Sequence, residues 1–146
     1  MIDRIDTWIF DLDNTLYPAE CNLFGQIDLR MKTFIAQDLG ISEEEAFVLQ
    51  KKYFLEHGTT LRGLMDNHSV APHAFLSFVH DIDYSPVPAN AELNAALAKL
   101  PGRKLIFTNG TVAHAEAVLD RLGIASHFDG IFDIAAADFV PKPSAA

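Results

Sequence analysis

The chain has 146 residues and a formal net charge of -9, from 11 lysine and arginine residues against 20 aspartate and glutamate residues. This length can form one core of ordinary size, or a small core with an inserted subdomain, without disulfide staples. The acidic balance, without a cluster of basic residues, argues against binding to a nucleic acid polymer, which needs basic side chains to replace phosphate counterions. No apolar run reaches the length of a membrane span, so we expect no membrane contact.

The amino terminus and the cysteine content favour the cytoplasm. Residues 1–6 lack the basic start and the apolar stretch of a signal peptide. The single cysteine, Cys21, cannot form an internal disulfide, and we interpret it as a small apolar residue rather than a catalytic thiol. A cytoplasmic protein is therefore expected.

The first predicted element is a core strand over residues 7–10, whose composition is β-branched and aromatic. Residues two apart in a strand point to the same side, so Asp11 and Asp13 emerge together where the strand ends, at the edge where open α/β sheets bind ligands. Two carboxylates that close need a cation or a shared proton, and Mg²⁺ suits oxygen ligands. A calcium loop starting at Asp11 is excluded, because Leu16 and Asn22 occupy the positions of its glycine and glutamate.

A helical segment follows this strand. Apolar residues three and four positions apart predict a helix from about Leu23 to Leu39. Ser42 and Glu45 form a capping-box pattern, which predicts a second helix from about Glu43 to His57. Two shorter helices are predicted over residues 61–67 and 73–80.

Beyond this segment, helix and strand patterns alternate, which predicts a parallel sheet with helices packed on its faces. The predicted elements are a helix along residues 93–100, a strand from Lys104 to Thr108, a helix along residues 112–122 and a strand from Ile131 to Ala135. The expected fold class is α/β, with a Rossmann-like parallel sheet core and an inserted all-helical cap. We place the core at residues 1–16 and 87–146, and the cap at residues 17–86.

Three short motifs in this order carry a family resemblance. The sequence DLDNT at residues 11–15 resembles the first motif of the haloacid dehalogenase superfamily of phosphatases. The IFTNG segment at 106–110 and the PKP segment at 141–143 resemble its second and third motifs. Two further segments, LYP at 16–18 and GTTLRGL at 58–64, are similar to the pyrimidine 5'-nucleotidase branch. The resemblance covers essentially the whole chain and implies the same core and cap.

The resemblance implies a phosphomonoester hydrolase that acts through an aspartyl-phosphate intermediate. Asp11 is then the nucleophile, and Asp13 protonates the leaving oxygen and later activates water. The Asp11 carboxylate and the Asp13 backbone carbonyl are the implied ligands of Mg²⁺. Phosphate binding and charge neutralisation are assigned to Thr108, Asn109, Gly110 and Lys142.

The resemblance indicates a small phosphorylated metabolite as the partner, with pyrimidine nucleoside 5'-monophosphates as the expected substrates and sugar phosphates or phosphoglycolate as the alternative. Candidate specificity residues are Tyr17, Thr60 and Arg62, although an ordinary salt bridge explains Arg62 equally well. His114 can face the site from its helix, but a structural histidine is the commoner case.

The sequence departs from the family pattern after Lys142. The family continues into a fourth strand with acidic residues that complete the metal site, and Asp129, Asp133 and Asp138 do not obviously replace them. We therefore expect a truncated chain whose core is incomplete at its C-terminal end, with the edge of the first strand open to self-association. A catalytically weak or inert phosphate-binding or assembly module is the hypothesis from another functional class.

Overall fold

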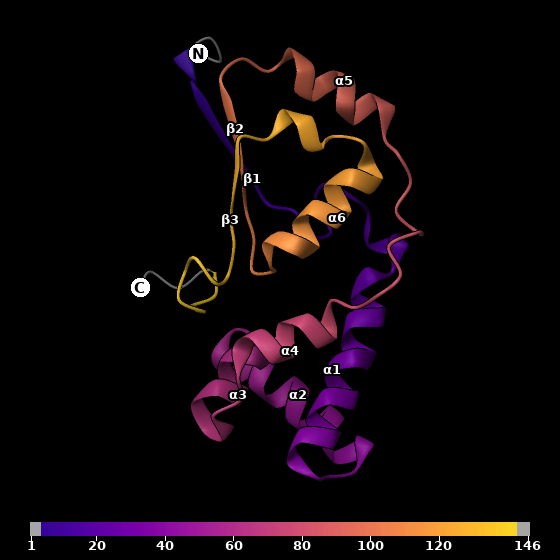
Figure 1. The fold of residues 1–146 in the computed structure, drawn as a ribbon, viewed down its shortest axis with the longest axis vertical. Coiled ribbons are helices and arrows are strands. Elements are labelled where there is room, and N and C mark those ends of the chain that lie inside the picture. The colour runs from indigo at the N-terminus through magenta and orange to yellow at the C-terminus, as the bar shows by residue number, and fades with distance from the viewer. Residues whose placement is uncertain (1–3, 143–146) are drawn as a thin grey trace. The chain divides into compact units, whose positions relative to one another are not determined.

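The computed structural model describes residues 4–142, which form two compact units (Figure 1). Within this range, the first unit contains residues 4–21 together with Tyr84–Ala137, and the second contains Asn22–Asp83 and residues 138–142. Each unit has its own buried apolar residues, such as Leu12 and Ile106 in the first and Leu64 and Phe75 in the second.

The first unit is built on a parallel sheet. Its strands are β1 (Thr7–Phe10), β2 (Arg103–Phe107) and β3 (Gly130–Phe132), in the order β1-β2-β3. The register pairs Phe10 with Ile106, and Phe107 with Phe132. Because the strands are parallel, their carboxyl ends meet at one edge of the sheet, and the residues that follow β1 and β2 emerge there together.

Two α-helices, α5 (Ala91–Lys99) and α6 (Val112–Leu122), lie on the same side of this sheet in Figure 1, and short 3-10 turns occupy Ala19–Cys21 and Ala125–His127. Helix α6 starts where the Thr111 hydroxyl accepts a hydrogen bond from the His114 backbone N–H at 3.1 Å. It ends at Gly123, whose φ of 78° is a left-handed conformation that glycine adopts without strain. The predicted helix at residues 112–122 is confirmed with these bounds.

The third strand is shorter than the sequence pattern predicts. We expected it to run to Ala135, but β3 ends at Phe132. The carboxylate of the next residue, Asp133, accepts hydrogen bonds from the backbone N–H groups of Val112 at 3.1 Å and of Ala136 at 2.9 Å. Asp133 therefore caps the start of α6 and turns the chain, so the predicted end of the strand was wrong.

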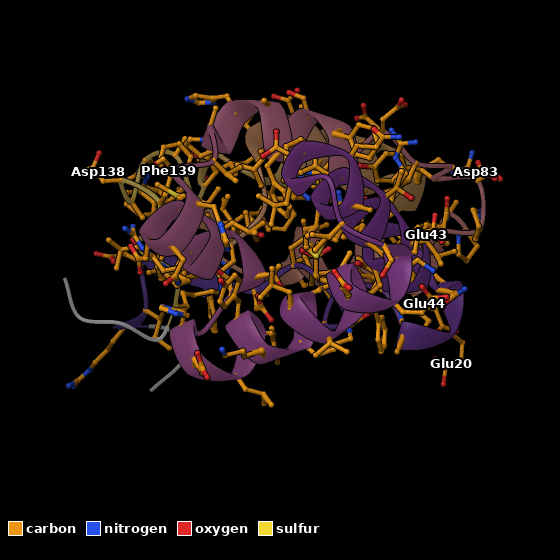
Figure 2. All side chains as sticks on the ribbon, turned by 90° about the horizontal axis from the view of Figure 1, so that it is seen from below. Glu20, Glu43, Glu44, Asp83, Asp138 and Phe139 are labelled. Atoms are coloured by element: carbon orange, nitrogen blue, oxygen red, sulfur yellow. The ribbon has the colours of Figure 1, made fainter. Side chains whose placement is uncertain are left out.

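The second unit is helical in the part of the chain that the structure describes, with α1 (Leu23–Leu39), α2 (Glu43–His57), α3 (Thr60–His68) and α4 (Pro72–Val79). The bounds of α1 and α2 are those that the sequence predicts. Ser42 caps α2 by accepting a hydrogen bond from the Glu45 backbone N–H at 3.1 Å. Glu43 and Glu44 lie exposed in the first turn of α2 (Figure 2). Negative side chains at this end stabilise a helix because they interact favourably with its dipole.

Aromatic rings of α1 and α4 pack against each other. The Phe34 ring meets Phe75 edge-on at 5.2 Å between centroids and Phe78 at 5.6 Å. Among residues 4–142, no helix is both long enough and apolar enough to cross a bilayer. Parallel strands with helices in one unit and helices in the other make an α/β fold, which confirms the expected fold class.

Candidate active site

Asp11 directly follows β1, and it is exposed at the carboxyl edge of the sheet. Leu12, the next residue, is fully buried, and its carbonyl accepts hydrogen bonds from the backbone N–H groups of Thr15 and Leu16. The Thr15 hydroxyl donates to Asp11 Oδ2 at 2.9 Å. The buried leucine anchors this tight turn, and the turn presents the Asp11 carboxylate to solvent.

The Asp13 carboxylate lies in a network of side chains, which we call the Asp13 network: Asp13, Tyr17, Tyr84 and His114. The Tyr17 hydroxyl lies 2.6 Å from Asp13 Oδ1, and His114 Nε2 lies 2.7 Å from the same oxygen. The Tyr84 hydroxyl lies 2.7 Å from His114 Nδ1. The His114 side chain is 0% exposed, whereas the Asp13 side chain keeps 16% of its surface exposed. The network thus leads from the interior of the first unit to a carboxylate that still reaches solvent.

The donors and acceptors of the network follow from the chemistry of its groups. When the Asp13 carboxylate is ionised it only accepts hydrogen bonds, so in that form both Tyr17 and His114 donate to Oδ1. In a neutral imidazole with its proton on Nε2, Nδ1 then accepts from the Tyr84 hydroxyl, a tautomer assigned from this bonding pattern. Burial, together with the neighbouring Asp13 carboxylate, raises the pKa of the Tyr17 phenol above its usual range. Tyr17 therefore keeps its proton, and its role as donor, at neutral pH.

Thr108 follows β2 and is buried at the same edge of the sheet. Its hydroxyl oxygen accepts a hydrogen bond from the Gly110 backbone N–H at 3.0 Å, and Asn109 is half-buried between them. A Cβ on Gly110 would lie only 3.1 Å from Cδ2 of His114. Glycine at this position therefore lets the His114 ring approach the Thr108 turn closely.

The remaining predicted site residues belong to the second unit. The buried Thr60 hydroxyl donates to the Gln50 carbonyl at 3.0 Å. Arg62 pairs with Asp66, with Nη2 and Oδ1 2.6 Å apart, and this hydrogen bond lowers the pKa of the Asp66 carboxyl below its ordinary value. Lys142 is half-buried. The roles assigned to these three predicted residues stay predictions.

The segment at residues 58–64, which carries part of the nucleotidase resemblance, forms the corner between α2 and α3. Gly58 ends α2 with a φ of 88°, and the Thr59 hydroxyl caps α3 by accepting from the Arg62 backbone N–H at 3.1 Å. A Cβ on Gly63 would overlap Cβ and Cγ of Tyr53. Several residues of this segment are therefore required by local packing.

Sequence reasoning favoured a structural role for His114 over one at the site, and it did not identify Tyr84 as a candidate. A signal for the first was present, because residues 114, 118 and 122 fall on one face of a helix whose other members are apolar. A histidine on that face is buried and needs partners. No local pattern indicated Tyr84, which lies 30 positions before His114.

The donor set near Asp11 fits Mg²⁺. Within the described residues no group of three or more histidine, cysteine or acidic side chains is arranged to hold a metal ion. Mg²⁺ is commonly bound by one or two carboxylates, with water and substrate phosphate completing its shell. The exposed Asp11 carboxylate and the Asp13 backbone carbonyl are oxygen donors of this kind. By contrast, the Asp129 carboxylate accepts a hydrogen bond from the Lys104 backbone N–H at 2.9 Å. The Asp133 carboxylate accepts one from the Val112 backbone N–H.

The family model of the haloacid dehalogenase-like hydrolases matches residues 5–146. The chain belongs to this family. Phosphate metabolism protein 8 of Saccharomyces cerevisiae is 30% identical over 136 residues, which cover 85% of this chain and 42% of that protein. The chain thus spans less than half the length of this relative. Family membership confirms the resemblance of the ordered motifs and identifies the chain as a member of a hydrolase family.

Two solved structures match most of this chain at low sequence identity. An L-2-haloacid dehalogenase from Xanthobacter autotrophicus, with chloropropionic acid covalently bound, matches 95% of this chain and 60% of its own, with a TM-score of 0.49 and 16% identity. The HAD-hydrolase YfnB from Bacillus subtilis, bound to magnesium, matches 92% of this chain and 67% of its own, with a TM-score of 0.46 and 17% identity. Family membership therefore rests on the family model.

Proposed function

We propose that this chain is a Mg²⁺-dependent phosphomonoester hydrolase with Asp11 as its nucleophile. The observation that carries the proposal is the contrast between two carboxylates at one sheet edge. Asp11 is exposed, as an attacking group must be, whereas two hydrogen bonds orient Asp13, as a proton-transfer group requires. Thr108, at the end of the neighbouring strand, brings a hydroxyl to the same edge.

In the proposed reaction, Asp13 enters in its protonated form. Asp11 attacks phosphorus while the bond to the leaving alcohol breaks, and Asp13 gives that oxygen its proton. Water then attacks the aspartyl phosphate and passes a proton back to Asp13. This hydrolysis releases phosphate and restores Asp11. The Thr108 hydroxyl donates to a phosphate oxygen, and the family resemblance assigns the supply of positive charge to Lys142. The Asp11 carboxylate and the Asp13 backbone carbonyl would hold Mg²⁺, which would supply positive charge for the phosphoryl oxygens.

The proposed substrates are pyrimidine nucleoside 5'-monophosphates. The similarity of residues 16–18 and 58–64 to the nucleotidase branch supports this choice, and the name of the yeast relative connects that protein with phosphate metabolism. Sugar phosphates and phosphoglycolate are the alternative substrates, and they belong in the same assay.

The test is phosphate release from nucleoside monophosphates, sugar phosphates and phosphoglycolate, with Mg²⁺ and with a chelator. We expect release that is fastest on pyrimidine nucleotides and is lost with the chelator. Asp11→Asn should lower kcat by several orders of magnitude, as removal of a covalent nucleophile does in other hydrolases. Asp120→Asn, an exposed site on α6, is the matched control and should leave the rate unchanged.

Other outcomes decide between the alternatives. Undiminished activity in Asp11→Asn would reject Asp11 as the nucleophile. If the folded wild-type chain binds phosphate but releases none from any of the substrates, the hypothesis of an inert binding module would be favoured.

A further inference from the structure

We propose that His114 is a positioning residue for Asp13 and that Tyr84 in turn orients the His114 ring. The inference deepens the proposed hydrolase function and rests on it, because the value of a fixed Asp13 lies in proton transfer. His114 and Asp13 are 101 positions apart in the sequence, and their hydrogen bond joins the turn after β1 to helix α6.

The His114 ring is held from several sides. Its helix is anchored by the Thr111 cap and by the bond from the Val112 backbone N–H to Asp133. Gly110 lies against one side of the ring, and the Tyr84 ring lies at 5.6 Å between centroids, with its hydroxyl at 2.7 Å from Nδ1. A buried ring with both nitrogens bonded has one orientation, so its Nε2–H is a fixed donor.

Two donors on one oxygen restrict the Asp13 carboxylate more than either donor alone. Tyr17 is four positions from Asp13 and belongs to the same turn, so that bond can move with the turn. His114 belongs to a packed helix, and its bond ties the carboxylate to the body of the first unit. A misplacement of about 1 Å in a reacting group can cost about a hundredfold in rate, so this tie has catalytic value.

The kinetic test compares two leaving groups. His114→Leu removes the donor, and we expect kcat on a nucleoside monophosphate, whose alkoxide leaves poorly, to fall by about a hundredfold. On 4-nitrophenyl phosphate, whose leaving group needs little protonation, the loss should be only a few-fold, because general acid catalysis contributes less there. KM should change little on either substrate.

Two further variants separate positioning from folding. His114→Gln places an amide N–H near the site of Nε2 and should restore most of the lost rate on the nucleotide. Tyr84→Phe should also lower kcat more on the nucleotide than on 4-nitrophenyl phosphate, but by a smaller factor than His114→Leu does. The control is His127→Gln, which alters a hydrogen-bonded histidine of the same unit that contacts Asn94, and it should have wild-type kinetics. Equal losses on both substrates in His114→Leu would overturn the proposal.

A second readout does not depend on turnover. In ¹⁵N-labelled protein, the imidazole signals of His114 should show a proton on Nε2, should shift at Nε2 in Asp13→Asn, and should shift at Nδ1 in Tyr84→Phe. An Nε2 signal that Asp13→Asn leaves unchanged would overturn the inference whatever the activity. The wild type can also show these shifts and hydrolyse no phosphomonoester. That result would establish the hydrogen bond between His114 and Asp13, but it would reject both the proposed function and the catalytic value of this bond.

Discussion

Asp11 and Asp13 stand two residues apart in the sequence, yet the structure gives them different surroundings. Asp11 is exposed and bonded to the hydroxyl of Thr15 within its own turn. Asp13 is largely buried and bonded to Tyr17 and to the distant His114. Different environments allow two identical side chains to take different chemical roles, as nucleophile and as acid or base.

The role of Asp13 can be tested directly with the two leaving groups. Asp13→Asn removes the group that exchanges protons and keeps a side chain of similar size. We expect a loss of about 10²–10⁴-fold in kcat on a nucleoside monophosphate, the range of general acid–base catalysis, and a much smaller loss on 4-nitrophenyl phosphate. Steady-state kinetics on both substrates measure the ratio, and equal losses would count against Asp13 as the general acid.

At the scale of elements, the corner between α2 and α3 shows how a short motif can serve packing. Thr59 caps α3, Thr60 bonds the Gln50 carbonyl of α2, and Gly63 leaves room for the Tyr53 ring. These contacts bring the two helices close together. A motif that is similar to one family branch therefore also has a purely structural explanation.

Gly63→Ala tests that explanation through the sign of its effect. Helix propensity alone predicts that the change stabilises α3 by roughly 0.5–1 kcal/mol. The overlap of the new methyl group with Tyr53 predicts instead a loss of about 1–3 kcal/mol, the usual cost of overpacking a core. Chemical denaturation gives the free energy of unfolding, and a stabilised variant would show that the close approach of the helices is not required.

At the scale of the whole molecule, the first unit joins two distant segments of the chain through its sheet. In the described residues β1 pairs with β2 alone, so it is an edge strand. Ile9 on β1 is 67% exposed and Phe132 on β3 is 48% exposed. The register places both on one face of the sheet, since Ile9 pairs with Leu105 and Phe132 with Phe107. Exposed apolar edge strands tend to pair with other chains.

We therefore expect self-association of this chain through β1. Ile9→Lys should weaken it by roughly tenfold or more, because a charge on an edge strand opposes pairing. Leu29→Lys is the matched control, since Leu29 is an exposed apolar residue of α1 in the second unit. Sedimentation velocity over a range of concentrations measures the association, and a wild type that stays monomeric throughout would contradict the prediction.

The sequence alone determined the elements whose signals are local. The bounds of α1, α2 and α6 follow from apolar periodicity and from residues such as Ser42, Thr111 and Gly123, which act within a few positions of themselves. The end of β1 just before Asp11 is likewise as predicted, whereas β2 ends at Phe107, one residue before the predicted end at Thr108. Short-range hydrogen bonds and side-chain periodicity are properties of a segment, so the segment is enough to predict them.

The tertiary structure decided the features that depend on distant partners. The strand β3 stops at Phe132 because the Asp133 carboxylate caps the start of α6, 21 positions away. The Asp13 network joins residues up to 101 positions apart, and the local pattern around His114 shows burial without naming a partner. Which acceptor a buried donor meets is set by how the helices and strands pack, because the large majority of buried polar groups find a partner in the folded chain.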